Sequence, residues 1–154
     1  MEKLLPRALR TRPSFAVIRL AALVRSDRAE KLAAVGLSQH QHGVLCCLDE
    51  FGPAAQKHVA ARLGLDSGDL VAFLDGLQAA GLIHRARDEH DRRRQILHIT
   101  PAGRQALERA EALLSDVADG PLGALDAAEL AHLQELATRV LTHRAPHAWA
   151  PAAE

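Results

Sequence analysis

A basic turn occurs in the second half of the chain, where three consecutive arginines, Arg92, Arg93 and Arg94, directly follow Asp91. A guanidinium group presents its N–H donors in a fixed plane, which suits phosphate oxygens and narrow grooves of negative potential. Short charged runs are also common as solvated surface turns that bind nothing. The elements on either side of the turn must decide between these two interpretations.

A second group of potentially reactive side chains lies on one predicted helix, where His42 and Cys46 share a face with Asp49 or Glu50. These residue types bind divalent metals, and positions four, seven or eight residues apart are workable on a helix. The spacing nevertheless matches no zinc signature, and helices bring such residues together by chance. We therefore predict no metal site and no cofactor.

The two cysteines, Cys46 and Cys47, are adjacent in the sequence. They do not form the spaced framework of a secreted disulfide protein, and the geometry of a helix opposes a bond between neighbours. Helical spacing places Cys47 on the core face and leaves Cys46 more exposed, so Cys46 is the candidate redox-sensing thiol. No nucleophile elbow, phosphate loop or catalytic pair of carboxylates occurs, so we expect no enzyme.

Composition and charge distribution limit the class of protein further. Of the 154 residues, 48% are hydrophobic and only 3% aromatic, so the core must be aliphatic, which favours helices. Basic residues outnumber acidic ones by five in residues 1–31 and by two in residues 54–104, whereas acidic residues are in excess by five in residues 105–154. Because DNA repels an acidic surface, any contact with nucleic acid is expected in the first two-thirds of the chain.

The sequence contains neither a membrane span nor a recognisable signal peptide. No run of about 18 apolar residues occurs, so no segment is expected to cross a membrane. Near the N-terminus, Arg7, Arg10 and Arg12 interrupt any apolar run of the kind that a signal peptide needs. We therefore expect a cytoplasmic protein.

Hydrophobic periodicity and its stop signals predict a mainly α-helical fold with six helices and one β-hairpin. Ser38 with Gln41, and Asp126 with Glu129, form capping boxes that begin the second and sixth helices. The second helix should bury a face made of Val44, Cys47, Leu48 and Phe51, and the fourth a face made of Leu70, Phe73, Leu74 and Leu77. The predicted helices span residues 14–34, 38–51, 55–63, 67–80, 101–119 and 127–143, and the hairpin pairs residues 82–87 with residues 95–99.

A helix, a tight turn, a second helix and then a hairpin is the order of a winged helix-turn-helix, whose second helix enters the DNA major groove. The hairpin resembles the wing signature of the MarR (multiple antibiotic resistance regulator) family, and residues 77–85 resemble the end of that family's recognition helix. The resemblance covers residues 14–143. The residues that carry it in the hairpin are Asp88, Asp91, Arg92, Arg93, Ile96, Thr100 and Gly103.

This resemblance implies a homodimer that binds double-stranded DNA. Residues 14–36 and 101–143 would form a helical dimerisation region from both ends of the chain, and residues 38–100 the winged helix-turn-helix lobe. Residues 1–12 and 144–154 would be flexible tails. Two recognition helices would then contact half-sites of a pseudo-palindromic operator about one turn of DNA apart. A repressor of this kind would leave its operator when a small-molecule effector binds.

The resemblance also implies roles for single residues. Asp91 would orient the wing, and Arg92 or Arg93 would reach the minor groove. The outward positions of the recognition helix carry no basic side chain, so methyl contacts and bonds from Ser67 or the backbone would read the bases. We interpret Asp69 and Asp75 as residues that serve capping and solubility. The outward positions are Ser67, Gly68, Asp69, Val71, Ala72 and Asp75, and the candidates for contact with the DNA backbone are Gln56, Lys57, Arg62, Arg85 and Arg94.

The effector pocket implied by the resemblance lies between the dimerisation helices and the DNA-binding lobe. Arg19, His42 and Cys46 are its candidate lining residues, and an anionic aromatic ligand would fit a pocket lined by arginine and histidine. Arg19 could equally be a surface charge or part of a salt bridge between subunits. Two alternatives remain open, namely a metal- or thiol-responsive regulator of the same fold and a winged-helix interaction module that does not bind DNA.

Overall fold

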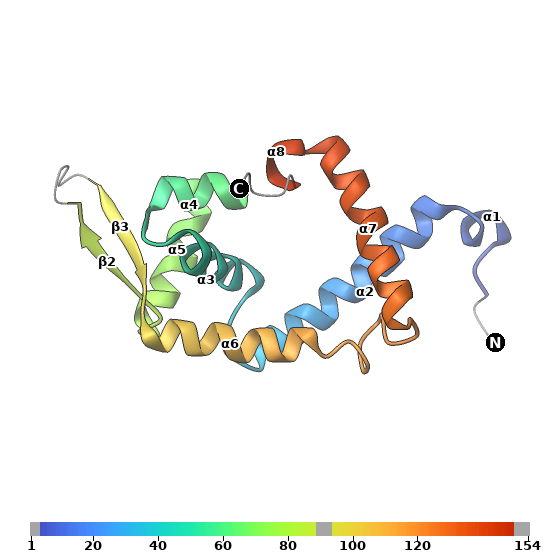
Figure 1. The fold of residues 1–154 in the computed structure, drawn as a ribbon, viewed down its shortest axis with the longest axis horizontal. Helices are drawn as coiled ribbons and strands as arrows, with labels where there is room; N and C mark the ends of the chain where they lie inside the picture. Colours follow the sequence, from blue (N-terminus) through green and yellow to red (C-terminus); the bar gives the residue numbers. More distant parts are fainter. Residues whose placement is uncertain (1–3, 89–93, 150–154) are drawn as a thin grey trace.

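The computed structural model describes residues 4–88 and 94–149. The chain is elongated, with a lobe of short helices and a small sheet at one end and two long crossing helices at the other (Figure 1). Helix α6 runs along the lobe and connects the two ends. The elements are α1 (Arg7–Arg10), α2 (Pro13–Ala33), α3 (Gln39–Phe51), β1 (Ala54–Ala55), α4 (Gln56–Leu63), α5 (Ser67–Ala79), β2 (Ile83–Arg87), β3 (Gln95–Ile99), α6 (Pro101–Ser115), α7 (Ala127–Arg144) and α8 (Pro146–Trp149).

The predicted mainly helical winged-helix fold is confirmed, as are both capping boxes. The backbone N–H of Gln41 donates to Ser38 Oγ and the N–H of Ser38 donates to Gln41 Oε1, which satisfies two of the free donors at the start of α3. Asp126 and Glu129 repeat this exchange at the start of α7. The one-turn helices α1 and α8 lie in segments that the sequence predicted as flexible tails.

The hydrophobic core lies in the lobe and is centred on α3. Val44, Leu45 and Leu48 are fully buried there and pack against Leu70, Leu74 and Leu77 of α5 and residues of the sheet. The prediction that Phe51 shares this buried face is wrong, because its side chain is 51% exposed. Phe51 is the last residue of α3, directly before the turn at Gly52, and there the helix has passed the edge of the core.

The sheet has three strands where the sequence predicted a two-stranded hairpin. β2 and β3 form the hairpin, with Arg85 opposite Leu97. β1 adds a short antiparallel pairing on the other side of β3, with Ala54 opposite Leu97, so the strand order is β1-β3-β2. Two alanines carry no alternating pattern that could have predicted a strand. This third strand attaches the start of α4 to the base of the wing.

The junction between the wing and α6 explains the spacing of Thr100 and Gly103 in the wing signature. The Thr100 hydroxyl donates to the carbonyl oxygen of Gly81 at 2.7 Å and accepts from the backbone N–H of Gly103 at 3.0 Å, so it caps α6 and holds the chain beside the end of α5. At position 103 a Cβ atom would overlap the carbonyl oxygen of Leu82. Glycine is therefore required for this close approach.

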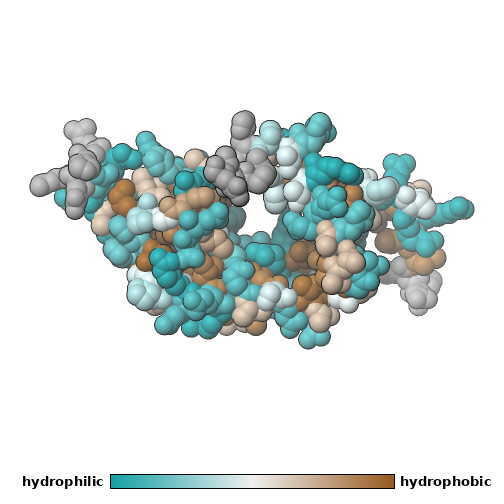
Figure 2. All heavy atoms as spheres, in the orientation of Figure 1, coloured by the Kyte–Doolittle hydropathy of each residue, from teal (hydrophilic) through white to brown (hydrophobic). Residues whose placement is uncertain are grey.

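The long helices outside the lobe bury few of their own side chains. Leu32 is the one buried residue of α2 among those described, and none of the described residues of α7 is buried. Neither helix, nor any other in the described ranges, is long and apolar enough to cross a membrane. Apolar side chains lie open on this end of the molecule (Figure 2), and the large ones exposed outside the lobe are Leu4, Leu5, Leu9, Val17, Ile18, Leu23, Leu113, Val140, Leu141 and Trp149.

Candidate nucleic-acid interface

Helices α4 and α5 are joined by a tight turn of the kind found in helix-turn-helix motifs. Gly64 ends α4 in the left-handed conformation with φ 64°, and the backbone N–H of Leu65 donates to the carbonyl oxygen of Ala60. Asp66 then caps α5, because its Oδ1 accepts from the N–H of Gly68 at 2.7 Å. The turn fixes the angle between the two helices and leaves one face of α5 uncovered.

The outward face of α5 is the one that the sequence predicted. Ser67, Gly68, Asp69, Val71, Ala72 and Asp75 are all exposed, while Leu70, Leu74 and Leu77 are buried beneath them. Val71 presents a branched apolar side chain on this face and is 41% exposed. A thymine methyl group in the DNA major groove is a suitable apolar partner for such a side chain.

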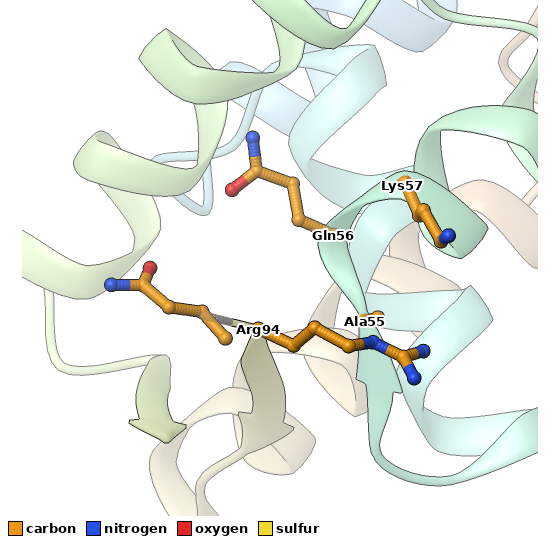
Figure 3. A pocket seen from close by; sticks show the side chains of 5 residues that line it. Ala55, Gln56, Lys57 and Arg94 are labelled. Atoms are coloured by element: carbon orange, nitrogen blue, oxygen red, sulfur yellow. The ribbon is translucent and has the colours of Figure 1, made fainter. Parts of the chain in front are cut away.

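A pocket between the start of α4 and the start of β3, at the turn end of the hairpin, brings together three of the residues predicted to contact DNA. Gln56 and Lys57 occupy the first two positions of α4, and Arg94 precedes β3; with Ala55 and Gln95 they line a pocket of about 330 Å³. Arg94 extends across Ala55 toward the side on which Lys57 lies (Figure 3). Two cations beside the positive end of a helix suit a phosphate group.

Arg85 is held by an ion pair that the sequence did not predict. Its Nη2 donates to Asp75 Oδ1 of α5 at 2.7 Å, and Arg85 is the less exposed of the two partners. The interpretation of Asp75 as a capping or solubility residue is therefore wrong, since it links α5 to β2. Arg85 Nε is buried without a hydrogen-bond partner among the described residues. A contact between Arg85 and a phosphate stays a prediction.

Two other arginines lie at the edges of this surface. The guanidinium of Arg62 stacks on the ring of Phe51, with its Cζ 4.1 Å from the ring centroid. Arg87 is exposed at the end of β2, opposite Gln95. Sequence reasoning did not select Arg87, although its position two residues after Arg85 places it on the same face of the strand. Asp91, Arg92 and Arg93 lie outside the described residues.

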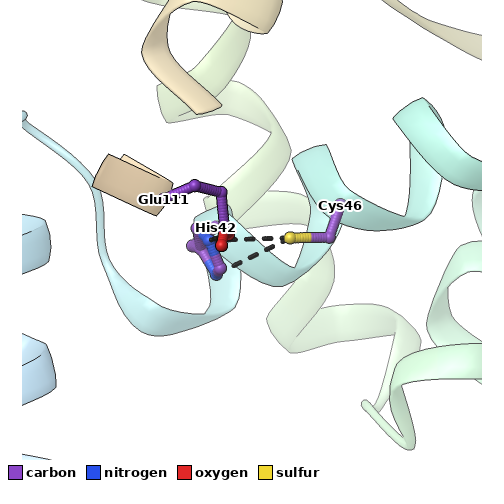
Figure 4. A group of neighbouring side chains, drawn as sticks. All are labelled: His42, Cys46 and Glu111. Atoms are coloured by element: carbon purple, nitrogen blue, oxygen red, sulfur yellow. Dashed lines mark hydrogen bonds and ion pairs between the residues drawn. The ribbon is translucent and has the colours of Figure 1, made fainter. Parts of the chain in front are cut away.

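A second cluster lies away from this surface, where α3 meets α6. His42 Nε2 is 2.7 Å from Glu111 Oε1, and Cys46 Sγ is 3.6 Å from the same nitrogen (Figure 4). The sequence expected Asp49 or Glu50 beside this pair, but Asp49 instead forms an ion pair with Arg104. Sequence spacing could not have revealed Glu111, which is 69 residues from His42.

Within the described residues Arg19, the third predicted pocket residue, is exposed on α2 and forms no hydrogen bond or ion pair with His42 or Cys46.

The environment of Cys46 disfavours its thiolate. Burial and, secondarily, the carboxylate of Glu111 raise the pKa of the Cys46 thiol to about 11, despite the opposing effect of Arg28. Reactive sensor thiols need the opposite shift. Cys47 is buried in the core as predicted, and both cysteines are free.

The lobe matches the family model of the MarR family over residues 37–94. Among curated proteins, the chain is similar to the HTH-type transcriptional regulator TtmR of Methylorubrum extorquens. The two are 35% identical over 99 residues, which are 64% of this chain and 51% of TtmR. The chain spans about half the length of the curated relatives it matches. These relatives carry the names of transcriptional regulators.

The fold is shared with solved MarR-family structures over most of the chain. One is a mutant of Escherichia coli MarR complexed with operator DNA, with a TM-score of 0.70, 23% identity, and coverage of 83% of this chain and 92% of that one. Another is Bordetella bronchiseptica BpsR, a protein whose DNA binding is regulated by 6-hydroxynicotinic acid. Its TM-score is 0.72 at 21% identity, with coverage of 88% and 96%.

Proposed function

The chain is a member of the MarR family by its winged helix-turn-helix lobe and its fold, and we propose that it is a homodimeric transcriptional repressor that binds double-stranded DNA. In this proposal α5 enters the major groove, and the wing lies on the backbone and in the adjacent minor groove. The Escherichia coli MarR mutant of the same fold was solved with its operator DNA. The chain would act in the cytoplasm, together with the DNA that it regulates.

The observation that carries the proposal is the arrangement of Gln56, Lys57 and Arg94 around one pocket beside the exposed face of α5. Elements that are distant in the sequence, the start of α4 and the turn end of β3, thereby present two cations on the same side of the lobe. Phosphate contacts beside a recognition helix fix its register and orientation in the groove. The polar but non-basic face of α5 implies that shape and backbone contacts contribute much of the affinity.

Dimerisation is supported by the uncovered helices outside the lobe. Among the described residues, all large exposed apolar side chains except Phe51 and Val71 lie outside residues 38–100. Large apolar side chains left exposed in this number are costly in water and are typical of an interface between subunits. We assign residues 14–36 and 101–143 to this dimerisation region and residues 38–100 to the DNA-binding lobe.

A small-molecule effector is the expected signal for release from DNA, by analogy with BpsR, whose DNA binding is regulated by 6-hydroxynicotinic acid. For this chain the effector site would lie where the lobe meets the long helices. The pocket found there is lined by Asp49, Arg104, Leu107, Glu108 and Glu111. Three carboxylates against one guanidinium give little support to the anionic aromatic ligand that the sequence analysis favoured, and Arg19 is not among the lining residues.

The direct test is a gel-shift titration with the DNA upstream of the chain's own gene, followed by hydroxyl-radical footprinting. We expect saturable retention, and protection in two patches about one helical turn apart on the DNA, as a two-fold dimer requires. Lys57→Ala should weaken retention, whereas Arg109→Ala should not, because Arg109 is an exposed arginine of α6 outside the lobe.

Two results would contradict the proposal. If no DNA fragment is retained at low salt, the alternative of an interaction module without DNA binding is correct. If Lys57→Ala and Arg109→Ala weaken retention equally, the surface around α4 and the wing is not the interface.

A further inference from the structure

We propose that His42, Cys46 and Glu111 form a binding site for a zinc-class divalent cation, and that its occupancy regulates DNA binding. The regulatory half of this inference rests on the proposed function, whereas the binding half does not. The three residues offer an imidazole nitrogen, a thiol sulfur and a carboxylate oxygen that all lie within 4.8 Å of one another. This site gives a specific form to the alternative of a metal-responsive regulator that the sequence analysis left open. Its third ligand is Glu111, whereas the spacing along the helix had suggested Asp49 or Glu50.

Two of the three separations between ligand atoms lie close to those around a tetrahedral zinc ion, and the third, between Cys46 and Glu111, is within 4.8 Å. With bonds of about 2.0–2.3 Å and tetrahedral angles, two ligand atoms of such an ion lie about 3.3–3.8 Å apart. Cys46 Sγ and His42 Nε2 are already 3.6 Å apart. Glu111 Oε1 is closer to His42 Nε2, at 2.7 Å, and must withdraw by less than about 1 Å. The Glu111 side chain is 58% exposed, so it is free to make that movement.

The choice of ligands favours zinc over calcium or magnesium. A thiolate and an imidazole are soft and borderline donors that hard cations avoid, and a carboxylate completes a set common in zinc proteins. Three protein ligands leave the fourth position open to water. An open position on an exposed side is a feature of exchangeable sites, since structural zinc sites are closed by four protein ligands.

The electrostatic surroundings also favour a cation. Asp49, Glu108 and Glu111 line the adjoining pocket, whose one guanidinium, Arg104, is paired with Asp49. A second guanidinium, that of Arg28, also acts on Cys46, so the carboxylates around the site exceed the guanidinium groups by one. An approaching cation therefore meets an excess of negative charge. The same charges would repel an anionic effector.

The position of the ligands links the site to DNA binding. His42 and Cys46 belong to α3, the central helix of the lobe, whereas Glu111 belongs to α6, which leads from the wing to the long helices. A bound ion would hold the two helices at one separation and angle. Because α5 and the wing move with the lobe, the spacing of the two recognition helices in a dimer would depend on that angle.

Cobalt binding to the full-length protein tests the binding half without any DNA. We expect one Co²⁺ per chain, with the near-ultraviolet absorption that a cobalt–thiolate bond produces, and competition by Zn²⁺. Cys46→Ala should abolish the band and Cys47→Ala should retain it. Glu111→Gln should lower the affinity for Co²⁺ by at least about tenfold. Removing even a residue that only hydrogen-bonds a metal ligand lowers metal affinity by roughly 10–100-fold. Glu135→Gln, which removes an exposed carboxylate of α7 that takes no part in the site, is the control and should change little.

The outcomes separate this inference from the proposed function. The site is wrong if no cobalt–thiolate band appears, or if Glu135→Gln and Glu111→Gln weaken Co²⁺ binding equally. Regulation is tested by repeating the gel shift with and without ZnCl₂. We expect ZnCl₂ to change the protein concentration at which half of the DNA is bound for the unaltered protein, and not for Glu111→Gln. If Co²⁺ binds as described but zinc leaves this concentration unchanged, the regulatory half is overturned. A protein that binds Co²⁺ but no DNA would contradict the proposed function and leave the metal site standing.

Discussion

Arg85 of the wing and Asp75 of the recognition helix are joined by an ion pair of 2.7 Å between Nη2 and Oδ1. The pair connects the two elements that the proposed function places on DNA together. Since each side chain was predicted to act alone, one toward phosphate and one toward solvent, their mutual contact changes the interpretation of both. It gives the wing and α5 a fixed relation before any DNA is bound.

The first prediction concerns the energy of this pair. A double-mutant cycle with Asp75→Ala, Arg85→Ala and the double variant should give a coupling of about 0.5 kcal/mol, because the Asp75 side chain is 59% exposed and such pairs are screened by water. Urea denaturation measures the coupling. Additive effects of the two single variants would show that the two side chains do not interact in solution.

A second prediction concerns the close approach at Gly103. Gly103→Ala should destabilise the chain by about 1–3 kcal/mol, because its Cβ would overlap the carbonyl oxygen of Leu82 and force the wing away from α6. Gly43→Ala is the matched control, since the nearest atom to a Cβ there is Leu63 Cδ2 at 3.5 Å. In the interior of α3 that substitution should stabilise by roughly 0.5–1 kcal/mol. Equal melting temperatures for the two variants would contradict this account of the junction.

A third prediction concerns the reactivity of Cys46 in the metal-free protein. The pKa of Cys46 is raised from 9.0 to about 11. The fraction of Cys46 present as thiolate at neutral pH should therefore be roughly a hundredfold smaller than for an unperturbed cysteine. Alkylation by iodoacetamide, followed by mass spectrometry, should therefore be slow. Modification at the rate of a free thiol would contradict the buried environment and reopen redox sensing through Cys46.

The same shift predicts a loss of stability in alkali. The Cys46 thiol, with its raised pKa, stays protonated up to about pH 11 in the folded chain, whereas the unfolded chain releases its proton near 9.0. The unfolded state therefore binds fewer protons between these values, and this thiol's contribution to stability falls as the pH rises through that window. Urea midpoints of the unaltered chain and Cys46→Ala should diverge there. If the urea midpoints of the two proteins change with pH in parallel, the pKa of Cys46 is not raised in the folded chain.

A further prediction separates dimerisation from DNA binding by placing one substitution at two sites. Val140→Glu, on the uncovered face of α7, should shift the mass in solution from dimer toward monomer, because a carboxylate cannot be buried unpaired in an interface. Val71→Glu, on the exposed face of α5, should leave the dimer intact and abolish DNA binding by charge repulsion. Light scattering measures the mass of each variant in solution and so distinguishes the two outcomes. A dimer that survives Val140→Glu would place the interface elsewhere.

The sequence predicted the elements whose signals are local. Ser38 with Gln41, Asp126 with Glu129, and Thr100 with Pro101 mark helix starts by side chains within one turn, so the helix boundaries agree with the structure to within a few residues. The outward face of α5 also followed from helical spacing alone. Strand β1 did not, because Ala54 and Ala55 pair with β3 for reasons of tertiary position, not of sequence pattern.

The parts of the site that depend on distant residues could not be predicted. Spacing on one helix suggested His42 and Cys46 as neighbours, but nothing in the sequence connects them to Glu111 of α6. The same limit explains the pairing of Asp75 with Arg85, which depends on how the hairpin packs against α5. Phe51 fits the buried face by periodicity, yet the helix ends there and the ring instead supports Arg62.

The salt dependence of DNA affinity is the sharpest test of the proposed DNA-binding surface. Fluorescence anisotropy with the upstream DNA at several salt concentrations should give a steep negative slope of log affinity against log salt, as counterion release requires. Lys57→Ala and Arg94→Ala should each weaken binding and reduce the slope by about one, and Arg109→Ala should leave it unchanged. If the Lys57→Ala, Arg94→Ala double variant keeps the affinity and slope of the unaltered chain, the surface formed by α4, α5 and the wing does not bind DNA.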